Sequence, residues 1–73
     1  MQNSEVIAVQ NYLRKLFGGD RIRLKAGRPG HPVEVYVGDE FVGTVYRDDE
    51  DGEVTYTLTL TVLASDLDQR GGD

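Results

Sequence analysis

Residues 53–63 read EVTYTLTLTVL, and this stretch decides the fold class. Its apolar residues occupy even positions from Val54 to Val62, and four threonines occupy the odd positions between them. Strict alternation places the two sets on opposite faces of a β-strand, whereas the apolar residues of a helix recur every three or four positions. Threonine is β-branched and favours the strand on either face. We therefore predict a strand over 53–63, whose length indicates a central position or pairing with another chain.

Three shorter segments with strand-like composition precede this strand: RIRLKA (21–26), VEVYV (33–37) and FVGTVYR (41–47). The loop 27–32 (GRPGHP) separates the first two and holds both prolines of the chain. Gly38-Asp39 suits a two-residue type II′ hairpin turn, and the acidic turn DDEDG (48–52) closes the last hairpin. Together these segments predict a four-stranded antiparallel meander.

The third strand has two incompatible orientations. A two-residue loop at Gly38-Asp39 turns Val42, Thr44 and Tyr46 towards the core. An even-length acidic loop instead turns Phe41, Gly43 and Val45 towards it. Both hairpins are regular only if the strand contains a bulge, for which Gly43 is the candidate position.

The N-terminal segment predicts an amphipathic helix that begins after Ser4 as the N-cap and ends at Gly18. Apolar residues recur in it at helical spacing: Val6, Ile7, Val9, Tyr12, Leu13, Leu16 and Phe17. The predicted fold is α+β, with this helix packed on the four-stranded antiparallel meander (α-β-β-β-β). We expect one domain over residues 1–63 and a polar, frayed tail over 64–73.

Composition excludes several kinds of site. The chain has 73 residues, no cysteine and one histidine, His31, so thiolate metal sites and disulfides are excluded and no histidine pair is available. No serine or cysteine lies in a nucleophile motif, and the carboxylates cluster in a solvent-exposed turn. We expect neither an enzyme nor a metal or other cofactor. We also expect no signal peptide and no membrane span, hence a cytoplasmic protein.

Two surfaces remain as candidate binding sites. One short helix covers only one face of the sheet, so the other face presents an apolar patch as a candidate protein interface. Its residues come from both orientations of the third strand and from the strand before it: Tyr36, Phe41, Val42, Val45 and Tyr46. The second candidate is a basic patch: Arg21, Arg23, Lys25 and Arg28.

Charge is unevenly distributed along the chain. Residues 1–36 hold six basic and three acidic residues, whereas residues 37–73 hold two basic and ten acidic ones. This asymmetry is typical either of two solvated faces or of a charge-steered contact with a protein partner or a second copy. Nucleic acid is the alternative ligand of the basic patch over residues 21–28, but a net charge of −5 opposes it. The sequence thus predicts a small interaction module or accessory subunit that self-associates through the second face or an edge of its sheet.

Two segments carry a family resemblance: AVQNYLRKLFGGDRIRLKA (8–26) and VEVYVGDEFVGTVYRDDEDGEVTYTLTLTVL (33–63). Their most specific pieces are LRKLFG, DRIRLKA, VYVGDEFVG and YRDDEDG. Together they resemble a family of short alphaproteobacterial proteins, domain of unknown function 3126. The resemblance excludes the GRPGHP loop and the C-terminal tail. It implies a bacterial, cytoplasmic protein and transfers no catalytic residue to this chain.

Overall fold

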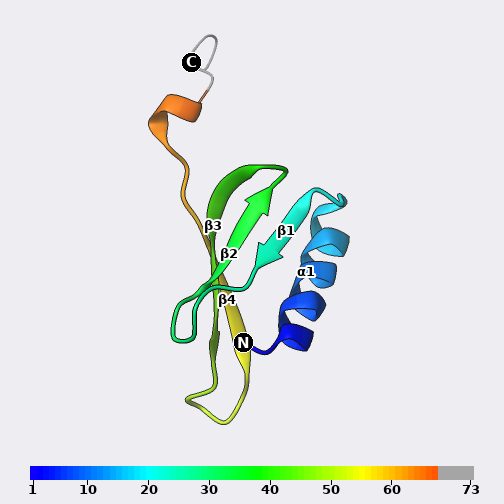
Figure 1. The fold of residues 1–73 in the computed structure, drawn as a ribbon, viewed down its shortest axis with the longest axis vertical. Helices are drawn as coiled ribbons and strands as arrows, with labels where there is room; N and C mark the ends of the chain where they lie inside the picture. The colour runs from blue at the N-terminus through cyan, green and yellow to red at the C-terminus, as the bar shows by residue number, and fades with distance from the viewer. Residues whose placement is uncertain (68–73) are drawn as a thin grey trace.

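The computed structural model describes residues 1–67, which form one helix followed by a four-stranded sheet (Figure 1). The elements are α1 (Asn3–Phe17), β1 (Ile22–Lys25), β2 (Val33–Val37), β3 (Glu40–Asp48), β4 (Thr55–Leu60) and a 3₁₀ turn, η1 (Ala64–Asp66). The strands lie side by side in chain order, and each is antiparallel to the next. The predicted α+β meander is confirmed. Of the predicted tail over 64–73, residues 68–73 lie outside the described residues.

Helix α1 begins earlier than predicted. Gln2, not Ser4, is the N-cap, and its backbone N–H donates to the Glu5 carboxylate at 2.9 Å. A carboxylate that returns to the N-cap amide satisfies a donor that has no partner within the helix, and it also suits the positive end of the helix dipole. The helix ends as predicted at Gly18, which adopts a left-handed conformation (φ 74°) and donates to the Arg14 carbonyl.

The hydrophobic core lies between α1 and the first half of the sheet. Val6 of the helix packs against three valines of β2 and β3, of which Val45 is only 1% exposed. Figure 1 shows α1 running beside β1. A helix is about 10 Å wide and strands are about 4.8 Å apart, so one helix covers about two strands. The β4 side of this face is therefore left without a helix.

A bulge in β3 resolves the conflict between the two hairpins. Val35 lies opposite Gly43 and Tyr36 lies opposite Phe41, so Val42 has no partner on β2. From Gly43 onwards, β3 pairs with β4 in a regular register, in which Val45 lies opposite Leu58. The extra residue lets Phe41 and Tyr46 point away from the helix while Val42 packs against the core.

Strand β4 is shorter than predicted and lies at an edge. It covers Thr55–Leu60 rather than 53–63, and within residues 1–67 it pairs only with β3. A central position is therefore excluded among the described strands. Pairing with another chain, the second explanation of the alternating pattern, stays a prediction.

Candidate interaction surfaces

The face of the sheet opposite the helix presents three aromatic side chains. Phe41 is 52% exposed and meets the ring of Tyr36 edge-on, with 5.7 Å between the ring centroids. Tyr46 is also exposed, at 50%. The structure thus places these three residues of the predicted interface on one face. An edge-to-face pair stabilises the sheet itself, so this face already has internal contacts.

Val42 and Val45 do not belong to that face, and the prediction is wrong for them. Val45 is buried in the core, and Val42 packs against the core from the β3 bulge. The hairpin alternatives each contributed one of these residues to the outer face. The bulge turns both towards the helix instead, because it inserts one residue into β3 between the two registers.

The predicted basic patch is divided among different contacts. Arg23 donates to the Gly38 carbonyl from Nε (3.2 Å) and from one terminal nitrogen (2.9 Å), and its guanidinium lies 5.8 Å from the Tyr36 ring centroid. Lys25 lies directly opposite Glu34 on β2. The Tyr36 hydroxyl donates to Glu34, and this hydrogen bond raises the pKa of Tyr36. The β1 cations thus face a hairpin carbonyl and a carboxylate, which compete with any phosphate.

Arg21 and Arg23 share the Gly38 turn, whereas Arg28 lines a hollow together with Lys25. The Arg21 side chain lies against the Gly38 turn, where its guanidinium would meet a side chain at that position. Arg28 belongs to the loop 27–32, which the Arg28 carbonyl closes by accepting from the His31 amide. The four predicted basic residues therefore lie as two pairs, one towards each end of β1.

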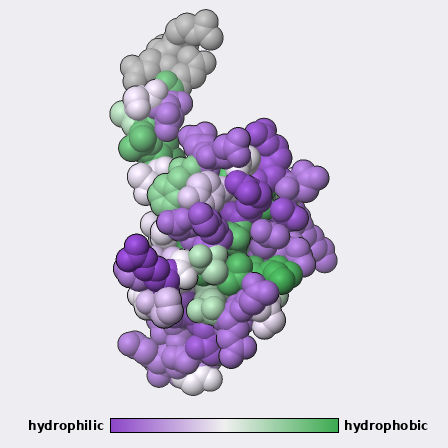
Figure 2. Space-filling model, viewed as in Figure 1, coloured by the Kyte–Doolittle hydropathy of each residue, from purple (hydrophilic) through white to green (hydrophobic). Residues whose placement is uncertain are grey.

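A groove on the helix-facing side was not predicted. It has a volume of about 750 Å³ and lies between α1 and β4, where no second helix covers the sheet. Its walls are mostly apolar: Ala8, Val9, Tyr12, Val54, Tyr56 and Leu58. Of these residues, Tyr12 carried a sequence signal, because together with Ile7 it widens the apolar stripe of the helix. Figure 2 shows apolar areas between charged side chains, and again on the segment that leads to the C-terminus.

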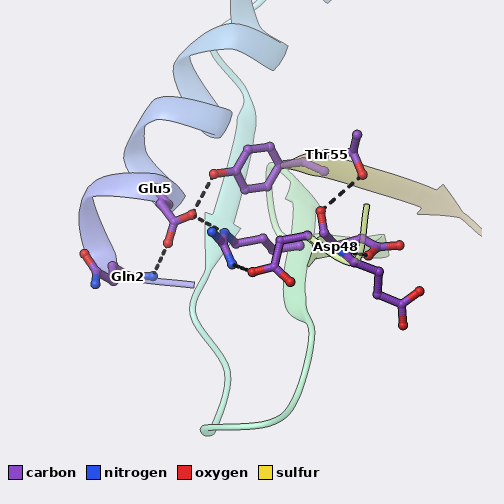
Figure 3. A network of polar contacts seen from close by, with 8 residues as sticks. Gln2, Glu5, Asp48 and Thr55 are labelled. Carbon is purple, nitrogen blue, oxygen red and sulfur yellow. Dashed lines mark hydrogen bonds and ion pairs between the residues drawn. The ribbon is translucent and has the colours of Figure 1, made fainter. Parts of the chain in front are cut away.

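A polar network includes Glu5 and Tyr56, two residues that line this groove (Figure 3). The Glu5 carboxylate accepts from the Tyr56 hydroxyl at 2.6 Å and pairs with Arg47 Nε at 2.9 Å. The Tyr56 hydroxyl and the Gln2 amide hydrogen-bond to the carboxylate and lower the pKa of Glu5 below its ordinary value of 4.5. The hydrogen bond between Tyr56 and Glu5 also raises the pKa of Tyr56. This network ties the start of α1 to the β3–β4 hairpin. Glu5 and Tyr56 are 51 positions apart in the chain, so no local sequence pattern predicts their contact.

The acidic turn at the end of this hairpin is held by its own contacts. Arg47 pairs with Asp49 at 2.9 Å, which raises the pKa of Arg47, and the Asp48 carboxylate accepts from the Glu50 amide. Thr55 donates to the Asp48 carbonyl at 3.4 Å (Figure 3). In the part of the chain that the structure describes, no group of three histidine or acidic residues is placed to hold a metal ion. The same residues contain no helix long and apolar enough to cross a membrane.

The two edges of the sheet differ. At the β1 edge, the Leu24 amide donates to Gln10 Oε1 at 3.0 Å, and the Ile22 carbonyl accepts from Arg14 Nε at 2.8 Å. Two helix side chains thus occupy the backbone groups that an incoming strand needs. At the β4 edge, no such contact is made by residues 1–67. The open edge of this sheet is therefore β4.

Comparison with known proteins gives one match. The model of a family described as "Protein of unknown function (DUF3126)" matches residues 5–66, a range that includes the GRPGHP loop. No curated protein and no solved structure matches the chain.

Proposed function

Because the chain belongs to the family described as protein of unknown function (DUF3126), a description that assigns no activity, we propose a function from geometry alone. The domain is a non-catalytic interaction module that self-associates through its β4 side. This surface is an edge of the sheet together with the adjoining groove.

The distribution of apolar side chains carries this proposal. Among residues 1–67, five hydrophobic side chains are buried and fourteen large ones are exposed. Of the exposed set, six side chains line the groove or the adjoining hollow, which share Leu13 and Leu58: Tyr12, Phe17, Val54, Tyr56, Leu60 and Val62. A contiguous exposed apolar area of this kind marks an interaction surface.

Size supports the same conclusion. A domain of this length buries only about 60% of the surface of its unfolded chain. Domains this small gain the missing stability from disulfides, metals or oligomerisation. The chain has no cysteine, so a disulfide is excluded. A second copy on the β4 side buries apolar area that the single helix leaves exposed.

Light scattering over a concentration series tests the proposal. We expect the wild-type protein to be a dimer at high micromolar concentration, with a melting temperature that rises with protein concentration. Leu60→Lys places a charge on the proposed surface, and Phe41→Lys places it on the opposite face at nearly the same exposure, 53% against 52%. Only Leu60→Lys is expected to shift the dimer to monomer. A wild-type monomer at high micromolar concentration, or dissociation by Phe41→Lys alone, overturns the proposal.

Nucleic acid is not the partner that we propose. Arg23 donates to the Gly38 carbonyl and lies 3.9 Å from the Asp39 carboxylate, and Lys25 lies opposite Glu34, so a carbonyl and carboxylates compete with phosphate for these cations. Affinity for nucleic acid depends on cations that displace counterions from phosphates. We expect no binding of a random oligonucleotide at low salt. Salt-dependent binding that Arg23→Glu weakens would restore the alternative.

We further propose that the protein works in the bacterial cytoplasm. The lack of cysteine fits a reducing compartment, and the resemblance of residues 8–26 and 33–63 to bacterial proteins supports the source. Fractionation of the native cells is expected to recover the protein with cytoplasmic markers. Recovery with membranes or with the periplasm refutes this location.

A further inference from the structure

We propose that β4 pairs with β4 of a second copy, antiparallel and centred on Leu58, to form one continuous sheet. This inference rests on the proposed self-association and specifies its geometry. It follows from the direction of the backbone groups along β4, from the alternation of its side chains and from the distribution of charge.

The backbone groups that β4 leaves open belong to Tyr56, Leu58 and Leu60. The Thr61 amide donates to the Val42 carbonyl of β3 at 2.9 Å. Backbone groups of successive strand residues point in opposite directions, so the odd-numbered residues 55–61 bond to β3. The N–H and C=O groups of the even-numbered residues therefore point outwards from the sheet, where they are available to another strand.

Pairing two such edges restricts the register. In an antiparallel ladder, two directly opposed residues both point their backbone groups at the neighbouring strand or both point them away. An outward residue of one copy must therefore oppose an outward residue of the other. Only the register centred on Leu58 opposes all three outward residues of β4 to one another, with Leu58 facing itself and Tyr56 facing Leu60.

The same register matches the side chains. Tyr56 and Leu60 point to the helix-facing side and are 40% and 53% exposed. In the paired sheet, Tyr56 of one copy lies beside Leu60 of the other. Val54 of one copy likewise lies beside Val62 of the other, and Val62 is 69% exposed. The apolar floor of the groove then continues into the partner strand. On the opposite face, Thr57 lies across from Thr59, and cross-strand threonine pairs are favourable.

Charge selects the antiparallel direction. The turn that precedes β4 carries a run of acids: Asp48, Asp49, Glu50, Asp51 and Glu53. A parallel pairing places the two acidic turns side by side, whereas the antiparallel pairing places them at opposite ends of the joined strands. The antiparallel arrangement also has two-fold symmetry and closes as a dimer, as most soluble homo-oligomers do.

A dimer of standard size needs only a modest share of the chain's surface. A stable interface of standard size takes about 800 Å² from each partner, which is about one-seventh of the 5863 Å² surface of this chain. The β4 edge contributes its backbone, and the segment after it contributes two further exposed leucines, Leu63 at 57% and Leu67 at 56%. Figure 1 shows that segment projecting from the end of the sheet.

Cysteine cross-linking tests the register, because the chain has no cysteine of its own. Opposed residues whose backbone groups point away from each other have Cα atoms about 4.5 Å apart, within the range of about 4.4–6.8 Å for disulfides. Thr57 and Thr59 form such a pair in the proposed register and are exposed on the outer face. We therefore expect a mixture of Thr57→Cys and Thr59→Cys proteins to form a covalent heterodimer on mild oxidation, while neither variant cross-links alone.

Each other result has a defined meaning. Cross-linking of Thr57→Cys alone, or of Thr59→Cys alone, shows a register slipped by two residues and centred on that threonine, and overturns the proposed register while self-association stands. A dimer in light scattering without any cross-link shows that copies meet elsewhere, and it overturns the β4 pairing only. A monomer in light scattering overturns both proposals. Thr44→Cys, on the same face but on β3, controls for random collision and is expected to remain uncross-linked.

Discussion

Replacing Gly43 by alanine is expected to destabilise the sheet beside the open edge. Gly43 lies in the β3 bulge opposite Leu60 of β4. A Cβ atom at this position would overlap the Thr59 carbonyl oxygen and would approach Leu60 Cα to 3.0 Å. Both obstacles are backbone atoms, so a side-chain rotation cannot relieve the contact. Strand β4 must move away from β3.

The magnitude follows from two opposing effects. Overpacking of a well-packed site costs about 1–3 kcal/mol. Alanine has less freedom than glycine in the unfolded chain, and this difference returns about 0.4–1 kcal/mol to the folded state. We expect a net loss of about 1–2 kcal/mol in the free energy of unfolding, with a fall of about 4–8 °C in melting temperature for each kcal/mol.

Urea denaturation at one fixed protein concentration measures this loss, because self-association makes stability depend on concentration. Gly19→Ala is the matched control: Gly19 has nothing within 4 Å of the added Cβ, and its φ is not in the left-handed region. The control is expected to be neutral or slightly stabilising. Equal stability of Gly43→Ala and Gly19→Ala would refute the close approach of β3 and β4 at the bulge.

Three further predictions concern the contacts of α1. Tyr56→Phe removes the hydroxyl that donates to Glu5 and is expected to lower the melting temperature. Tyr46→Phe is the control, because the Tyr46 hydroxyl has no hydrogen-bond partner within residues 1–67, and it is expected to leave the melting temperature unchanged. An equal effect of both contradicts the network. Because the pKa of Glu5 is lowered, its contribution to the free energy of unfolding is fully present above pH 4.5 and is lost as the pH falls through the lower folded-state pKa. The free energy of unfolding, measured at decreasing pH, should therefore fall less in Glu5→Gln than in the wild type. The same pH profile in both proteins contradicts this assignment. Gln10→Ala exposes the Leu24 amide, so hydrogen exchange at that amide should accelerate; unchanged protection would show that Gln10 does not close the β1 edge.

Local sequence patterns predicted the elements well because each pattern depends on neighbours in the chain. The strand over 33–37 has the predicted bounds, and the helix ends at Gly18 because glycine adopts the left-handed conformation without a Cβ penalty. The start of the helix was missed by two residues. The Gln2 amide is satisfied by the Glu5 carboxylate, so a serine at position 4 is not needed as the cap.

The candidate surfaces were harder to predict than the elements. Tyr36, Phe41 and Tyr46 share the outer face, but Val42 and Val45 both turn inwards at the bulge. The sequence indicated that a bulge was required, yet its effect on each side chain depends on the pairing of three strands together. The position of α1 over β1 and β2 likewise depends on contacts between distant residues, and this position creates the groove.

The amino-acid sequence by itself determined the order and type of the elements, the class of the fold and the alternation of Val54–Val62 with the threonines, because these depend on periodicity and turn chemistry. Only the tertiary structure decided that the clearest strand lies at an edge and that this edge is open. The reason is the placement of one helix: its Gln10 and Arg14 close the β1 edge, and the same placement leaves β4 uncovered. Alternation shows which side chains share a face, whereas packing decides which backbone groups remain without a partner.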